Sequence, residues 1–331
     1  MAKEQEKKRV PFTKRQVLMR RVLLATTPCI AGGVYYFGWR SLAMVLVACS
    51  VAYIAEYLFC RQHGEPVTEA AFVTGTLYAL VMPPSVPWHV LVVGVAFAIV
   101  FTKMAFGGFR RNVFNPAIAG RCFVYVCFPV ALTATWAPVA QGPWGALGQW
   151  TTAVSPDVVT SATPLALLKA GEISLDGSDA FYGLFLGRID GTMGVTSALL
   201  ILLGGAYLYW TRTANRTLIV TVILVYAALN FLLNFLGVQP VPPAHMAVMG
   251  GGFLFGAFFM VTDPVSSPCT RMGRVLFASL IATGTVVIRN FSVFNGGLMF
   301  SILLGNMFGP LFDHAVIAVR DRKKAEKAEP A

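Results

Sequence analysis

Charged residues are scarce in this chain. Asp, Glu, Lys and Arg make up 12% of its 331 residues, whereas hydrophobic residues make up 56%. The apolar residues gather in long blocks, which a soluble domain does not need. Several blocks, such as 218–235, approach the roughly 20 apolar residues that cross a bilayer. We therefore expect a protein that is integral to a membrane.

Residues that bind metals or sulfur clusters are also few. The four histidines are scattered along the sequence, and their spacing indicates no metal site. The six cysteines lie mostly inside apolar runs without CxxC spacing, so we interpret them as packing residues. Iron–sulfur or disulfide ligation is the alternative for them. The chain also lacks a G-x-G-x-x-G element that opens a βαβ unit, so no NADH site is evident.

The positive charge follows a membrane pattern. The net charge is +11, but its carriers cluster in the two tails and in short loops, which argues for the positive-inside rule and against a nucleic-acid partner. Residues 1–21 carry eight Lys and Arg and no small-residue cleavage site, so they are expected to form a cytoplasmic arm rather than a signal peptide.

The apolar blocks predict an all-α polytopic membrane protein with about ten transmembrane helices. The expected spans are 22–39, 41–59, 67–83, 88–106, 113–130, 193–211, 217–237, 245–262, 275–289 and 297–317. They divide the chain into the arm 1–21, a first five-helix half 22–130, a segment 131–192, a second half 193–317 and a charged tail 318–331. Both termini are then cytoplasmic, and the acidic segment 131–192 is extracytoplasmic.

A repeat relates the third and eighth spans at an offset of 181 residues. Five identities fall within 16 positions, and both copies end in P-x-S-x-P, at Pro83 to Pro87 and Pro264 to Pro268. The two spans run in opposite directions in the expected topology, so the halves would be inverted. Chance similarity between apolar helices rich in Gly and Phe is the alternative.

Both copies contain residues that interrupt a helix. The sequences FVTGTLYALVMPPSVP and FLFGAFFMVTDPVSSP carry Gly and Pro where a span should continue. Lipid cannot satisfy the backbone groups that such breaks release, so they are tolerated where protein or a cavity surrounds them. Inverted folds with broken helices often place their site between the breaks.

The sequence DVVTSAT at 157–163 lies in the extracytoplasmic segment. Taken alone, it is a turn or helix-start signal, because Ser, Thr and Asp are cap donors. It also matches the modification motif D-x-x-[S/T]-[G/S]-A-T. Because the motif lies in an extracytoplasmic segment of a membrane protein, covalent modification is the alternative to a simple helix cap.

The chain resembles a family that comprises the B subunit of the sodium-translocating NADH:quinone oxidoreductase and the D subunit of the Rnf-type ferredoxin:NAD oxidoreductase. The similarity runs from about residue 66 to 314. Its anchors are EAAFVTG (69–75), FGGFRRNVFNPAIAGR (106–121), DVVTSATPL (157–165), FFMVTDPVSS (258–267) and NMFGPLFDH (306–314). EAAFVTG and PLFDH read more like the first of these two proteins, and the short region before the first span favours the second.

The resemblance implies that a flavin transferase attaches FMN through its phosphate to Thr163. Asp157, Thr160 and Ala162 match the recognition pattern, and Ser161 stands where glycine is more usual. A threonine hydroxyl is a competent phosphate acceptor. An extramembrane loop is also open to a modifying enzyme.

The resemblance also implies a second flavin, riboflavin held without a covalent bond, at Asn112 and Asn115. Their spacing places both amides on one face if the helix has already begun there. The alternative is a helix start at Asn-Pro with asparagine caps.

Acidic residues in or near the spans are costly and therefore informative. The resemblance implies that Glu69, Asp263 and Asp313 belong to a sodium pathway, whereas it implies no such role for Glu56. Carbonyls released at the broken helices would complete the ion's ligands. The alternative is that these acids lie near an interface or pair with a neighbouring subunit.

The expected function is electron transfer from covalent FMN to riboflavin and on to ubiquinone, coupled to sodium transport. Electrons would enter through other membrane and soluble subunits of a redox complex in a bacterial inner membrane. The alternatives are the D subunit of an Rnf-type complex and a flavin-free secondary transporter with the same inverted halves.

Overall fold

The structure is a computed structural model that describes residues 13–133, 136–140, 142–152, 178–189, 191–292, 294 and 296–328. Within that part the fold is nearly all helical, and its two strands, β1 (Thr13–Lys14) and β2 (Val67–Thr68), pair in parallel. Five of the described helices are long and apolar enough to cross a membrane. The predicted all-α polytopic membrane fold is confirmed.

The first half follows the expected spans closely. Its helices are α1 (Val17–Phe37), α2 (Trp39–His63), α3 (Ala70–Leu80), α4 (Trp88–Ile99), the π-helical segment η1 (Val100–Met104), α5 (Pro116–Cys127) and α6 (Pro129–Thr133). Helix α1 begins five residues before the expected span, and Thr13 and Lys14 pair with β2. The end of the expected arm is thus part of the fold.

The second half repeats this order with a more divided third helix. Its helices are α9 (Ala198–Trp210), α10 (Arg216–Phe235), α11 (Ala244–Met249), α12 (Phe253–Phe255), the π-helical η2 (Gly256–Met260), α13 (Arg271–Phe291) and α14 (Gly297–Ala328), and α8 (Ser178–Leu186) precedes them. Helix α14 passes through the expected boundary at 317 without ending, because its last residues are mostly Ala, Lys, Arg and Glu, which favour helix.

The helix breaks lie at the prolines of both copies, whereas Gly75 of the first copy lies inside α3 without a break. Polar side chains bind carbonyl oxygens at both breaks. Arg40 donates to the carbonyl oxygen of Val86 at 2.7 Å after α3, and Asn306 donates to that of Ser266 at 3.2 Å after η2. The second copy has an additional break at 250–252, where Gly252 adopts φ +71°, a region that favours glycine. Both breaks are therefore enclosed by protein.

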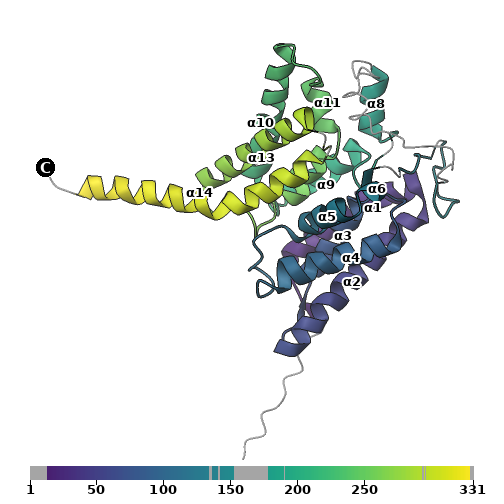
Figure 1. Cartoon of the computed structure of the whole chain (residues 1–331), viewed down its shortest axis with the longest axis horizontal. Helices are drawn as coiled ribbons and strands as arrows, with labels where there is room; N and C mark the ends of the chain where they lie inside the picture. The colour runs from purple at the N-terminus through teal and green to yellow at the C-terminus, as the bar shows by residue number, and fades with distance from the viewer. Residues whose placement is uncertain are drawn as a thin grey trace, which may run out of the picture.

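The two halves are interlocked. Figure 1 shows α1 to α5 gathered on one side and α9 to α14 on the other, with α14 extending away from the body. Helix α1 nevertheless packs against α9, and a Cβ at Gly204 would overlap the carbonyl oxygen of Ala25. Small residues permit this close approach of helix backbones in a membrane.

Candidate functional site

A pocket lies beside the break that follows η2 in the second half. Its lining comes from α1, α3, η1, the loop and first turn of α5, α9 and the loop after it, and η2 with the turn that follows it. It encloses about 710 Å³ of empty space, including the part that is open to solvent. The lining residues are Leu18, Met19, Val22, Ala70, Val73, Thr74, Leu77, Lys103, Phe109, Asn112, Asn115, Pro116, Ala117, Leu208, Thr213, Ala214, Phe259, Thr262, Asp263, Pro264 and Val265.

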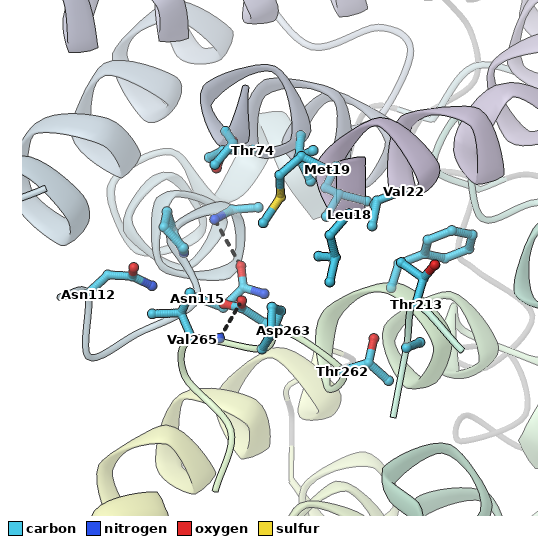
Figure 2. A pocket seen from close by; sticks show the side chains of 18 of the residues that line it. Leu18, Met19, Val22, Thr74, Asn112, Asn115, Thr213, Thr262, Asp263 and Val265 are labelled. Carbon is cyan, nitrogen blue, oxygen red and sulfur yellow. Dashed lines mark hydrogen bonds between the residues drawn. The ribbon is translucent and has the colours of Figure 1, made fainter. Parts of the chain in front are cut away.

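The pocket has an apolar wall and a polar edge. Leu18, Met19 and Val22 of α1 form part of the apolar wall, and Figure 2 shows Asn115 and Asp263 among the polar residues of the lining. A planar ring with one polar edge and one apolar edge matches such a lining.

Asn115 is both a helix cap and a link between the halves. Its Oδ1 accepts from the backbone N–H groups of Ala117 at 3.1 Å and Ile118 at 3.4 Å, and α5 begins at the next residue. Its Nδ2 donates to the carbonyl oxygen of Met260 at 3.2 Å, at the end of η2. Asn306 of α14 in turn accepts from the backbone N–H of Asn115 at 3.1 Å.

Asn112 lies in the loop, so the condition that the helix has already begun there is not met. Its Nδ2 donates to the carbonyl oxygen of Phe114 at 3.0 Å. No partner of its Oδ1 occurs among the described residues, so this acceptor is available to a ligand in the pocket. The capping interpretation is therefore confirmed for Asn115, and Asn112 carries the freer amide of the two.

Asp263 lies in the turn after η2 rather than inside a helix. Its oxygens accept from the backbone N–H of Val265 at 3.1 Å and from the hydroxyl of Ser266 at 2.9 Å. No Lys, Arg or His in the described ranges forms an ion pair with it. It is thus a carboxylate on a pocket wall that forms no ion pair with the described residues.

The other two acids of the expected ion pathway lie outside the pocket lining. Glu69 accepts from the Arg20 guanidinium at 2.6 and 2.8 Å and from the backbone N–H of Gln16, which holds the start of α1 against α3. Asp313 accepts from the backbone N–H groups of Cys269 at 2.7 Å and Thr270 at 2.9 Å, at the start of α13. The structure brings Asn112, Asn115 and Asp263 together. It places Glu69 at the start of α3 and Asp313 inside α14, against the start of α13.

One polar cluster beside the pocket was missed by the sequence interpretation. Lys103 of η1 forms an ion pair with Glu56 of α2 at 2.5 Å, and Thr68 hydrogen-bonds to both. The sequence could have indicated this ion pair, because Glu56 and Lys103 both lie inside expected membrane spans. A buried charge in a membrane requires a partner.

The motif at 157–163 lies outside the described residues. This holds for Asp157, Thr160, Ser161, Ala162 and Thr163 alike. Its flanks are described: residues 142–152 contact the junction of α1 and α2, where the N–H of Arg40 donates to the carbonyl of Trp150 at 2.8 Å. On the other flank, α8 packs against α9 and α11.

The fold and the pocket define a polytopic membrane protein with a pocket beside the helix break after η2. Its family is shown by a family model, described as the NQR2, RnfD, RnfE family, which matches residues 11–320. The chain belongs to this family, and the resemblance found in the sequence is confirmed.

Relatives of two kinds match the chain over most of its length. The B subunit of the Na(+)-translocating NADH-quinone reductase of Pseudomonas aeruginosa is 35% identical over 89% of this chain and 70% of its own length. The D subunit of the ion-translocating oxidoreductase complex of Stutzerimonas stutzeri is 36% identical over 89% of each chain. The D subunit of the proton-translocating ferredoxin:NAD(+) oxidoreductase complex of Clostridium ljungdahlii is 35% identical over 89% of this chain and 88% of its own.

Proposed function

We propose that this chain is a flavin-carrying membrane subunit of an ion-translocating oxidoreductase. It holds FMN as a phosphoester on Thr163 and riboflavin in the pocket, and it passes electrons from the first to the second. The observation that carries the proposal is the pocket beside the helix break after η2, with the free acceptor of Asn112 on its polar edge.

The residues of the pocket fit an isoalloxazine. The ring has a polar pyrimidine edge, for which Asn112, Thr262 and Lys103 offer hydrogen-bonding groups, and a dimethylbenzene edge, for which Leu18 and Val22 offer apolar contact. The flavin supplies the redox chemistry when it is bound, and the chain's residues position it and exclude water.

The wider proposal places the chain in a bacterial inner membrane, with its termini in the cytoplasm and segment 131–192 outside. Partner subunits deliver electrons from NADH, ubiquinone accepts them, and a flavin transferase loads Thr163. Sodium transport is coupled to this electron transfer, and Asp263 is the acidic residue of the pocket that binds the cation. Glu69 and Asp313 are further members of the ion pathway in this proposal.

The second candidate is the role of the D subunit in a ferredoxin:NAD oxidoreductase. The relatives with that name match this chain over 88–89% of their own length, at nearly the same identity as the NADH-quinone reductase relative. Assays of the intact purified complex separate the two: NADH-to-quinone activity supports the first candidate, and ferredoxin-to-NAD activity supports the second.

The covalent flavin is tested on a denaturing gel under ultraviolet light. The chain, purified from cells that contain the transferase, is expected to fluoresce, and Thr163→Ala is expected to be dark. Thr151→Ala is the matched control, because it removes a hydroxyl nearby in the same segment 131–192 and is expected to remain fluorescent. A dark wild-type band would exclude covalent FMN and favour a flavin-free transporter.

A further inference from the structure

The loop 142–152, which we call the platform, presents an apolar surface beside the junction of α1 and α2. Its sequence, GPWGALGQWTT, contains no charged residue. Its two tryptophans, Trp144 and Trp150, are 80% and 58% exposed, and Leu147 between them is exposed as well. A group of exposed large apolar side chains marks a contact with a membrane or with a partner.

Backbone hydrogen bonds hold the platform against the junction. The N–H of Ala146 donates to the carbonyl oxygen of Tyr35 at 2.7 Å, and the N–H of Arg40 donates to that of Trp150 at 2.8 Å. Gly38 has φ +95°, and a Cβ there would lie 2.8 Å from the carbonyl oxygen of Trp150. Glycine permits both this conformation and this close approach. The place of the platform on the junction is therefore fixed by the main chain.

Helix α2 shows where the boundary of the membrane lies. Its exposed large apolar residues include Trp39, Leu46, Ile54 and Leu58, whose spacing of 7, 8 and 4 places them on one helix face. The distance along the helix from the first to the last is about 28 Å at 1.5 Å per residue. This length matches the roughly 30 Å of the hydrocarbon core. The basic Arg61 follows at the far end, so Trp39 lies at the opposite boundary of the core.

The platform joins the lipid-facing side of α2 at this boundary. The Nε1 of Trp39 donates to the carbonyl oxygen of Leu147 at 2.9 Å. The guanidinium of Arg40 lies 5.4 Å from the ring centroid of Trp88, at the start of α4. Together with the two in the platform, four of the six tryptophans of the chain gather here. Tryptophan is enriched at the membrane–water boundary because its ring is apolar and its N–H is polar.

We propose that the platform binds the surface of the bilayer and that Trp144 and Trp150 insert between the lipid headgroups and the acyl chains. The partner is a lipid surface of any charge, because the platform has no cation that would select anionic headgroups. A lipid surface is favoured over a partner protein because the platform continues the lipid-facing side of α2 at the depth where tryptophans gather. The inference does not depend on the proposed function.

The test measures tryptophan fluorescence of the full chain in phosphatidylcholine nanodiscs that contain nitroxide-labelled lipid. The emission lost in Trp144→Phe belongs to Trp144, and Trp150→Phe gives that of Trp150 in the same way. A nitroxide near the headgroup is expected to quench this emission about twofold more than one at the end of the acyl chain, because interfacial side chains enter the bilayer by only about 5–10 Å. Iodide in the water phase is expected to quench it weakly. Replacing part of the phosphatidylcholine with phosphatidylglycerol is expected to leave these values unchanged.

Trp136→Phe is the matched control. Trp136 belongs to the same segment 131–192 but is half-buried, and its Nε1 donates to the carbonyl oxygen of Thr133 at 3.0 Å. The emission lost in this variant is expected to be less sensitive to the lipid nitroxides. Quenching of Trp144 and Trp150 by iodide without quenching by lipid would show that the platform faces water, and would overturn the inference. Protection from both quenchers would show that protein covers the platform, and would overturn it as well.

Discussion

Lys103 and Glu56 form an ion pair of 2.5 Å between side chains that are 2% and 1% exposed. They lie 47 residues apart in the sequence, in η1 and α2, and their contact fixes the π-helical end of the fourth span against the second. Thr68 donates its hydroxyl to Glu56 and accepts from Lys103, so the start of the third span joins the same cluster. The cluster thus fixes the geometry of one wall of the pocket.

Removing one member of this pair is expected to destabilise the protein strongly. Glu56→Gln leaves Lys103 charged and buried, which typically costs about 3–5 kcal/mol. The midpoint of thermal unfolding of the purified protein in detergent measures the loss. The double variant Glu56→Leu with Lys103→Met removes both charges and is expected to recover most of the stability. A double variant as unstable as Glu56→Gln would contradict this account.

Asn112 and Asn115 are expected to respond differently to substitution. Asn112→Leu removes a free acceptor from the pocket and is expected to lower the riboflavin released by acid extraction, with little change in the unfolding midpoint. Asn115→Ala removes the cap of α5 and is expected to cost about 0.5–2 kcal/mol. Asn115→Asp retains the cap acceptor and should recover part of that loss. Equal riboflavin content in Asn112→Leu and wild type would remove Asn112 from the flavin site.

Asp263 is expected to govern the response to sodium. Asp263→Asn removes the unpaired carboxylate from the pocket, and the sodium concentration for half-maximal activity is expected to rise about tenfold, equivalent to about 1.4 kcal/mol of binding free energy. Steady-state activity of the complex over a sodium titration measures it. Asp321→Asn, at an exposed position of α14, is the control. An unchanged sodium response in Asp263→Asn would exclude this carboxylate from the ion pathway.

Close packing between the halves is tested at Gly204. A Cβ there would overlap a backbone oxygen of α1, so Gly204→Ala must separate α1 from α9. Such overpacking typically costs about 1–3 kcal/mol. Gly148→Ala is the control, because nothing lies within 4 Å of its Cβ. Equal unfolding midpoints for the two variants would show that the helices adjust without cost.

Much of the helical framework was predictable from apolar block length. Helix α10 spans Arg216–Phe235 against an expected 217–237, because a long uninterrupted apolar run has one stable conformation in lipid. The limits of α1 and α14 were less predictable. Basic residues mark where a span leaves the membrane. They do not mark where the helix ends, because Lys and Arg also favour helix.

The site was predictable only in part. Asn115 and Asp263 were singled out from motifs, yet a motif does not reveal that both line one pocket or that Asn115 bonds to Met260 145 residues away. A second short identity, VFN, precedes α5 at 113–115 and α14 at 293–295. This identity was a further indication in the sequence that the residues before α5 belong to the site.

By itself, the sequence determined that the chain is an apolar helical protein with paired, interrupted spans, since hydrophobic block length and Gly and Pro positions act locally along the chain. The tertiary structure decided which charges are compensated. Glu56 pairs with Lys103 and Glu69 pairs with Arg20, whereas the buried Nε of Arg121 has no hydrogen-bond partner among the described residues. Pairing depends on which helices become neighbours, and that is a property of long-range packing that no local pattern encodes.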